Sequence, residues 1–502
     1  MKKYFYILVA SIILSLPVAI QAQSLLDGIR LSQPQLGTGT RSFGMGGAMV
    51  AATNDYTSLD WNPAALTLLH FGEFSISLWS AGHSSEASFF NNTSYNDLTN
   101  TTLASVGAAM PVPTERGHFA FGLSYDRVQD YTNAYAFKAV NPNSSFLNTQ
   151  GFVNDPGYHG GSYSDYLDEL NNYNLAWALY TTYDNDSLNT KLTTPFTGGL
   201  QQSGTVTEEG GLYAFRIGAG IDIAEDVALG ATLNFYNGTY DYRRVYREED
   251  VNNVFSRTDS LAPLGFKKAE IVDSRYQSQF GIGLKLGMFA RANEHLDLGL
   301  TFETPTVYDV RDEFFRSGNT WFNYASYTSN NQPSLEGIII NEYDIVTPLK
   351  VAAGLAFHLE GATISGGIDY QDMSQLRYKN YAVDLGDLND KIREELGSVL
   401  SWRIGGEYIF APAKLSLRAG YRVDPSPYKL DPSEYDKKTF SGGIGIVIGK
   451  STLLEFSYQN QSYTTDHSIY NDLTVEGQAA SANIDQDIVS RNIFTFSVGF
   501  RF

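Results

Sequence analysis

The last segment of the chain, NIFTFSVGFRF, constrains the fold strongly because its side chains alternate between apolar and small or charged. The apolar set is Phe494, Phe496, Val498, Phe500 and Phe502, and the opposite set is Thr495, Ser497, Gly499 and Arg501. A period of two predicts a β-strand with two different faces. A second apolar sheet could not pack behind the polar face, whereas lipid outside and water or polar protein inside would satisfy both. The segment therefore predicts one strand of a transmembrane barrel.

The same alternation recurs along the chain, and fourteen segments show it. They begin near Phe74, Ala104, Phe119, Tyr213, Val227, Phe280, Leu296, Leu349, Ala362, Trp402, Leu415, Phe440, Leu454 and Phe494.

The lengths of the connections between these segments provide an independent test. The short joins are VPTERG, IAED, RANEH, HLEG, APAK and GKST, and each follows an even-numbered strand. The long connections follow the odd-numbered strands, the longest at residues 129–210. Outer-membrane barrels alternate short periplasmic turns with long external loops in this way, and a soluble sandwich gives no reason for it. We predict an all-β fold, a 14-stranded antiparallel transmembrane β-barrel over residues 71–502, surrounded by the outer-membrane lipid of a Gram-negative bacterium, with both termini periplasmic.

The beginning of the chain predicts export. Lys2 and Lys3 precede a largely apolar run and the small-residue exit LPVAIQAQS, which is typical of a secretory signal peptide over residues 1–22. The apolar run is shorter than the roughly 20 residues that a membrane helix needs. The chain has no cysteine, so it forms no disulfides and carries no lipid on an N-terminal cysteine. Its formal net charge of -20 argues against nucleic acid as a partner.

The segment RSFGMGGAMVAATNDYTSLDWNPAALTLL, residues 41–69, is too glycine-rich for a helix, too irregular for a strand and too apolar for a free tail. A barrel of fourteen strands encloses more space than its own side chains fill, so we predict that residues 23–70 form a hatch in the lumen. Gly44, Gly46 and Gly47 permit tight turns close to the wall, and Pro63 fixes the chain direction. Inward charged residues would give irregular backbone polar partners. They are Arg216, Lys285, Glu303, Lys350, Asp369, Arg403, Glu407, Arg418 and Glu455.

The motifs RSFGMGGAMVA and DWNPAAL, the order of a hatch before fourteen strands and the terminal phenylalanine resemble one family of outer-membrane channels. These are the FadL and TodX type channels for long-chain fatty acids and aromatic hydrocarbons. The resemblance implies a hatch containing Asn62, Pro63 and Ala64, and recognition of Phe502 by the barrel-assembly machinery. In that family the solute is thought to leave sideways beside a kinked third strand. Here the third strand, HFAFGLSYD, offers Gly122 as its obvious bend point.

The long connection contains SYSDYLDELNNYNLAWALYTTY, which predicts one helix capped by Ser162 or Ser164. Its apolar face would carry Tyr166, Leu170, Tyr173, Trp177 and Tyr180. An exposed apolar face needs a reason, which is either packing on neighbouring loops or capture of an apolar ligand at the outer mouth. We list these five residues as candidate ligand-binding residues, with packing as the alternative.

The sequence contains no HExxH or Cys/His spacing and no GxSxG motif, so we expect no metal, no cofactor and no catalytic residues. We predict a monomeric channel, not an enzyme, for the passive uptake of hydrophobic small molecules through a hatch-gated barrel. The alternative is an outer-membrane binding scaffold or shuttle for exported proteins in a secretion system. Transport predicts a continuous apolar path from the outer loop to the hatch, whereas a scaffold predicts a sealed lumen.

Overall fold

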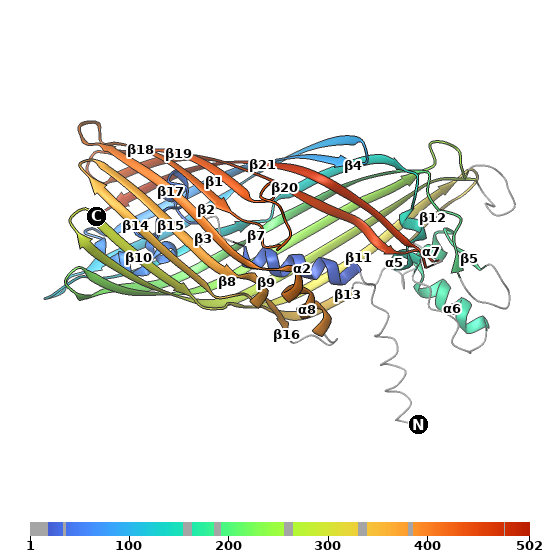
Figure 1. Cartoon of the computed structure of the whole chain (residues 1–502), viewed down its shortest axis with the longest axis horizontal. Coiled ribbons are helices and arrows are strands. Elements are labelled where there is room, and N and C mark those ends of the chain that lie inside the picture. The colour runs from blue at the N-terminus through green and yellow to red at the C-terminus, as the bar shows by residue number, and fades with distance from the viewer. Residues whose placement is uncertain are drawn as a thin grey trace, which may run out of the picture.

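The computed structural model describes residues 19–33, 37–153, 163–184, 192–255, 265–329, 339–379, 385–475 and 477–502. In these ranges, fourteen antiparallel strands close into a barrel, as the alternation predicted (Figure 1). The pairing order is β1 (Glu73–Phe89), β2 (Asn92–Val112), β3 (Phe119–Asp130), β7 (Leu200–Ala224), β8 (Val227–Glu249), β9 (Phe266–Asn293), β10 (Leu296–Glu303), β14 (Lys350–Leu359), β15 (Ala362–Asp372), β17 (Ser398–Phe410), β18 (Leu415–Asp424), β19 (Lys437–Ile448), β20 (Thr452–Leu473) and β21 (Ala479–Arg501). Strand β21 pairs back onto β1, which closes the ring.

An apolar belt surrounds the barrel on its outer surface. On β9 the exposed side chains are Phe280, Ile282, Leu284, Leu286 and Met288. Residues 280–288 match the roughly 9–11 residues that a tilted strand needs to cross a bilayer. Lys285, between two of these leucines, is buried. The inward and outward faces are therefore those that the alternation predicted.

The two ends of the barrel differ in the length of their connections. The short joins at residues 113–118, 225–226, 294–295, 360–361, 411–414 and 449–451 lie together at one end, which we call the short-turn end. Phe502 lies at that end, because its backbone N–H donates to the carbonyl of Gly72, next to the start of β1, at 2.8 Å. We call the opposite end the long-loop end.

The wall is much higher on one side than on the other. Strands β7, β8 and β9 have 25, 23 and 28 residues, whereas β15, β17, β18 and β19 have only 10 to 13. The short turns align the strands at one end, so the extra length extends the high side toward the long-loop end (Figure 1). Further strands extend the wall there: β4 (Asn133–Asn141), β11 (Val307–Phe322), β12 (Ser326–Thr328), β13 (Ile339–Val346) and β16 (Arg377–Lys379). A separate hairpin is formed by β5 (Tyr183–Asp184) and β6 (Leu192–Thr193).

The N-terminal helix α2 (Ala19–Ser32) lies beside helix α8 (Gly386–Glu395) (Figure 1). Asp27 of α2 bonds to Arg275 and Gln277 of β9, which lie beyond the belt on the side of the long-loop end. The periplasmic placement of both termini stays a prediction, but the described N-terminal helix lies toward the long-loop end, away from Phe502. The reason is that the chain runs from α2 down through the barrel before β1 begins. Residues 1–18 of the predicted signal peptide lie outside the described residues.

Within the described ranges, no helix is both long and apolar enough to cross a membrane. The remaining helical elements are η2 (Phe146–Asn148), α5 (Gln150–Val153), α6 (Tyr163–Tyr173), α7 (Leu175–Ala178), η4 (Met373–Gln375) and η5 (Ala411–Ala413), together with three in the lumen.

The third strand bends, but not at the predicted residue. The register of β3 against β7 is regular through Gly122 and shifts between Arg127 and Gln129. Gly122 instead gives space, because a Cβ there would lie 3.2 Å from a methyl carbon of Leu59 in the lumen. After the bend, β2 pairs with β3 only over residues 105–112, and its outer part, residues 92–104, pairs with β1 alone. Beyond Ser105 and Asp126, at the outer edge of the belt, the wall therefore has a seam without ladder bonds, beside which β4 lies close to β2.

Candidate functional site

The inner segment, defined as residues 37–69, contains three short helices. These are α3 (Thr40–Gly44), α4 (Ser58–Trp61) and η1 (Pro63–Leu68). Its polar contacts reach β7, β9, β17 and β20, which lie at different points around the ring, so the segment lies inside the barrel. Met45, Met49, Ala64 and Leu66 are fully buried. Enclosure by the barrel wall explains how so apolar and irregular a segment is stable.

Asn62 joins the inner segment to the wall. Its side-chain amide donates to the carbonyls of Val50 and Met288, both at 3.0 Å. Its Oδ1 accepts from the N–H of Ala64 at 3.2 Å, which caps η1. Pro63 occupies the first turn of this helix, where a backbone N–H would have no partner within the helix, so proline loses no hydrogen bond there. The Asn-Pro-Ala motif therefore begins a helix and holds it against β9.

Glycines on the inward faces of the strands let the inner segment approach the wall backbone. A Cβ on Gly287 would lie 2.2 Å from Asn62 Oδ1, and a Cβ on Gly299 would lie 2.2 Å from the Val50 carbonyl oxygen. Opposite them, a Cβ on Gly420 would meet Met45 and Gly46 at 2.3 to 2.6 Å. No larger residue fits at these positions without displacing the segment.

The glycines of the inner segment have different roles. Gly46 and Gly47 have φ values of 63° and 75°, a region that favours glycine, and form the tight turn after α3. Gly44 lies in α3 against Gly443, where a Cβ would come within 3.2 Å of the wall backbone. The predicted hatch glycines therefore lie at the turn and at the wall contact.

Asp60 is the centre of a buried charged group. Its carboxylate pairs with Arg216 at 2.8 Å and lies 3.5 Å from Lys285, and the hydroxyl of Thr38 donates to it at 2.9 Å. Arg216 also pairs with Asp126 of β3. Burial alone raises the pKa of Asp60, but Arg216 and Lys285 outweigh burial, so the pKa lies below its usual value. The ionised carboxylate therefore holds α4 to the wall.

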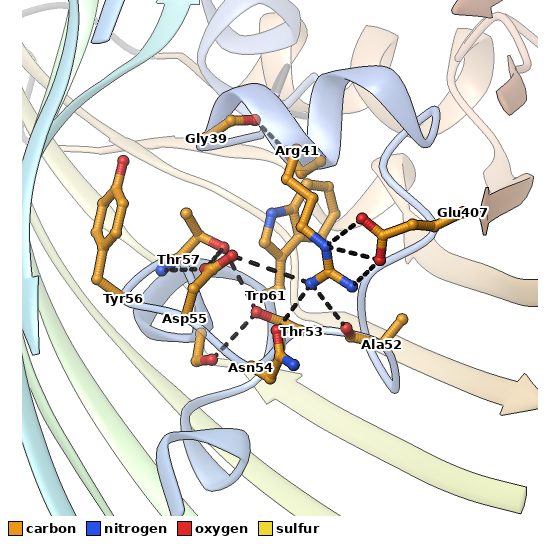
Figure 2. Close-up of polar contacts among 12 residues, drawn as sticks. Gly39, Arg41, Ala52, Thr53, Asn54, Asp55, Tyr56, Thr57, Trp61 and Glu407 are labelled. Carbon is orange, nitrogen blue, oxygen red and sulfur yellow. Dashed lines mark hydrogen bonds and ion pairs between the residues drawn. The ribbon is translucent and has the colours of Figure 1, made fainter. Parts of the chain in front are cut away.

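Arg41 makes the second charged contact, on the β17 side (Figure 2). Its guanidinium donates to the Glu407 carboxylate, at 2.7 Å from Nη2 and 3.2 Å from Nε. It also donates to the Ala52 carbonyl at 3.1 Å and to Asn54 Oδ1 at 3.0 Å, which ties the loop after α3 to the same point. Glu407 also accepts from Arg418 at 2.7 Å. One arginine thus links two parts of the inner segment to the wall.

A cavity of about 30 Å³ lies between the inner segment and the wall, with room for about one water molecule. It is lined by Val50, Asp60, Trp61, Lys285, Thr301, Glu303, Lys350, Ala352, Asp369 and Arg403. Its six charged groups comprise three acids and three bases. This part of the lumen is therefore polar and closely filled.

Above the inner segment the lumen changes to an apolar, tyrosine-rich lining, which we call the tyrosine cluster. It includes Val128, Tyr131, Leu212, Tyr236, Tyr240, Tyr308, Val310, Tyr343, Ile345, Leu376 and Tyr378. Leu25, Ile29 and Leu31 of α2 are buried in this cluster, whereas Leu26 is 51% exposed. One face of α2 therefore fills the apolar part of the lumen.

The outer loop differs from the prediction of one helix with an exposed apolar face. Asn174 interrupts the helix between α6 and α7, and its side chain accepts from the N–H of Trp177. Tyr166 and Leu170 are buried among residues from η2, α5, β8 and β20, and only Tyr180 is clearly exposed. The side chain of Tyr173 lies outside the described residues. Tyr166 and Leu170 are therefore not exposed as predicted, because neighbouring loops pack on them, and ligand binding by the five residues stays a prediction.

Three residues that hold the lumen segments were not identified from the sequence: Asp27, Arg41 and Asp60. Each is a charged residue in a mostly apolar stretch, and each has an inward-facing partner of opposite charge on a strand. The isolated charges were a usable signal, because a buried charge requires a partner. Their pairing with particular strands depends on the tertiary arrangement and could not be read from spacing.

No protein-family model matches the sequence, and no curated protein matches it either. Solved structures match in fold. A Pseudomonas aeruginosa FadL homologue is 11% identical, with a TM-score of 0.57. The P. putida toluene transporter TodX is 12% identical, with a TM-score of 0.53. Each comparison covers 93% of this chain and 99% of the other. The resemblance to FadL and TodX type channels is thus confirmed at the level of fold.

Proposed function

We propose that the chain is an outer-membrane channel of a Gram-negative bacterium that passes hydrophobic small molecules, long-chain fatty acids or aromatic hydrocarbons, by passive diffusion. Residues 1–22 are a signal peptide in this proposal, residues 23–70 are the hatch, and the barrel acts as a monomer. Phe502 is read by the barrel-assembly machinery. The fold shared with a FadL homologue and TodX supports this function.

The observation that carries the proposal is that the lining of the lumen changes from charged to apolar along the barrel axis. Next to the inner segment the lumen is charged and glycine-lined, whereas above it the tyrosine cluster is apolar and holds α2. A water-filled pore would not need an apolar, aromatic section. Apolar surface of this kind binds apolar solutes, at roughly 25 cal/mol per Å² removed from water. A solute that displaces α2 thus gains the contacts that the helix now makes.

Onward passage requires the inner segment to move or the wall to open. The seam between β2 and β3 is the place for a lateral exit, since a side-chain bond from Asn100 to Thr132, at 3.3 Å, crosses it where the ladder is absent. The path toward the short-turn end is closed by the contacts of Arg41 and Asp60. In our proposal these contacts set how often the hatch moves.

The test uses the absence of native cysteine. Ser58→Cys would introduce a single thiol at a residue that is fully buried in the inner segment. We expect a water-soluble maleimide to label it slowly, and faster when a hydrophobic solute is added. Glu294→Cys, at an 86% exposed side chain in a short turn, provides the control for reagent access. A labelling rate at Ser58→Cys that no hydrophobic solute changes, together with no uptake of these solutes by cells, would contradict the proposal.

A scaffold or shuttle for exported proteins is the second candidate, because the long-loop end is filled. The apolar residues there, which we call the outer cluster, join η2, α5, α6 and α7 to β8, β20 and β21. A closed outer end fits a binding surface as well as a resting channel. Cells that contain the protein but take up no hydrophobic solute, while retaining an exported protein at their surface, would favour the scaffold.

A further inference from the structure

A groove of about 440 Å³ lies on the outer surface of the high side, where it crosses β7, β8, β9 and β11. Its volume is within the range of about 300–1,000 Å³ that is usual for ligand sites. We infer that this groove, which we call the outer groove, binds the sugar head group of a glycolipid in the outer leaflet. The inference goes beyond solute transport and depends only on the outer-membrane placement and orientation in the proposed function.

The strand register places the outer groove on the face of the wall that carries the belt. Tyr276 lies four residues from Phe280 of the belt, so both side chains are on the outward face of β9. The outward side chains of the groove form two adjacent cross-strand rows, Glu209, Asp241, Tyr276 and Glu313, then Thr207, Arg243, Ser274 and Phe315. The groove therefore continues the lipid-facing surface beyond the belt.

The outer groove lies above the level of phospholipid head groups. Tyr276 and Ser274 are four and six residues beyond Phe280, which is roughly 14–20 Å of strand length. A strand tilt of roughly 35–45° converts this length to a height of roughly 10–16 Å above the belt. The polar layer of a bilayer is only roughly 5–8 Å deep on each side. In the proposed placement, the sugars of outer-leaflet glycolipids extend beyond that layer and reach the groove.

The lining of the outer groove offers the two kinds of surface that a sugar ring contacts. Tyr276 is 41% exposed and Phe315 is half-buried, so aromatic surface remains uncovered outside the belt. The C–H face of a sugar ring is apolar and can cover such surface. The ionised carboxylates of Glu209, Asp241 and Glu313 can only accept hydrogen bonds, and sugar hydroxyls donate them. A sugar therefore satisfies both parts of the lining at once.

The charges on the outward face of the outer groove select against phosphate. Its three carboxylates outnumber the single guanidinium of Arg243, so a phosphate group would be repelled. Glu313 accepts from Arg311 at 3.0 Å, but Asp241 has no such cation. Burial raises the pKa of Asp241, and no neighbouring positive charge in the described ranges lowers it. The groove therefore suits hydroxyl groups, or an amino group on the sugar, and not the phosphates of a lipid head.

The test measures binding to the full-length, folded protein in detergent by native mass spectrometry. The probes are lipopolysaccharide with core sugars and lipid A, which lacks them, and the first should bind about tenfold more tightly. Asp241→Asn should weaken lipopolysaccharide by about tenfold, since a bond to a charged group is lost, and Tyr276→Ala by severalfold. Both changes should leave lipid A unaffected. Asp97→Asn and Tyr95→Ala make the same changes at exposed positions of β2, outside the groove, and should have no effect.

Two results would overturn the inference. Equal binding of lipopolysaccharide and lipid A, in the wild type and in both groove variants, would show that the groove does not bind sugar. A soluble core oligosaccharide that binds as tightly as the intact glycolipid would show that the membrane is not the source. Uptake of hexadecanoate by cells is measured in parallel, and Asp241→Asn should leave it at the wild-type level. Absence of uptake by the wild type would contradict the channel and leave the groove assignment standing, so the two proposals fail separately.

Discussion

Arg41→Ala should release one side of the hatch without unfolding the barrel. The change removes the ion pair with Glu407 and the bonds to Ala52 and Asn54. Glu407 keeps Arg418 at 2.7 Å, so no buried acid is left unpaired and the larger penalty for a lone buried charge does not apply. A bond to a charged partner contributes about 1.5–3 kcal/mol.

We therefore expect the closed state to weaken by about 2–3 kcal/mol, which multiplies the fraction of open molecules by about 30- to 150-fold. Single-channel recordings in planar bilayers measure that fraction directly. Arg311→Ala, at an exposed surface pair, removes an arginine from outside the lumen and should leave the openings unchanged.

Glu407→Gln and the double variant complete a thermodynamic cycle, in which the two single effects should not add because both remove the same contact. Equal open fractions for Arg41→Ala and the wild type, in barrels that fold normally, would show that this contact does not hold the hatch. Additive effects would show that Arg41 acts through Ala52 and Asn54 and not through Glu407.

Three further predictions concern the lumen and the belt. Deleting residues 23–59 should leave a folded barrel with a large conductance, because the strand ladder closes without them; bilayer recordings matching the wild type would refute the hatch. Leu284→Arg, on the belt, should impair assembly by about 2–4 kcal/mol in a bilayer folding assay, whereas Lys285→Ile should fold and open more often; equal folding yields of Leu284→Arg and wild type would contradict the facing. The frequency of channel openings should also increase as the pH falls below about 4. The pKa of Asp60 is lowered, so its ionised form stabilises the closed state above that pH, and protonation of Asp60 removes its pairing with Arg216. Asp60→Asn should remove this pH dependence.

The sequence predicted the membrane-crossing part of the wall well and the outer part poorly. Within the belt, lipid outside and a polar lumen impose strict alternation, so Phe280 and Phe494 were recognised as strand residues. The strands themselves begin at Phe266 and Ala479, because the hydrogen-bonded ladder continues beyond the belt, where apolar side chains such as Ile271 and Ile484 are buried in the outer cluster instead of facing lipid. The alternation of residues shows whether lipid or water lies on each side of a strand. It does not show how far the hydrogen-bonded ladder extends.

The site was predictable in part for a similar reason. The location of residues 37–69 in the lumen followed from the volume of the barrel and from the cost of exposing their apolar side chains to water. The bend of β3 was not predictable, because it occurs at Arg127 and Gln129, whose types carry no turn signal, and not at Gly122. The packing of Leu170 under the outer loops depends on strands that are remote in sequence.

The uneven height of the wall has a consequence for how a solute first meets the protein. About 14 residues of β9 lie beyond the belt, roughly 45 Å of strand length. In the proposed orientation, this high side extends through the polar surface layer of the cell as a curved wall. The inner face of that wall is apolar. An apolar molecule moves poorly through a hydrated layer, since its transfer from apolar surroundings into water is unfavourable. On the low side, over β15, β17, β18 and β19, the end of the barrel lies closer to the lipid surface. In the proposed function, a solute already dissolved in the leaflet therefore has a shorter way to the lumen on this side.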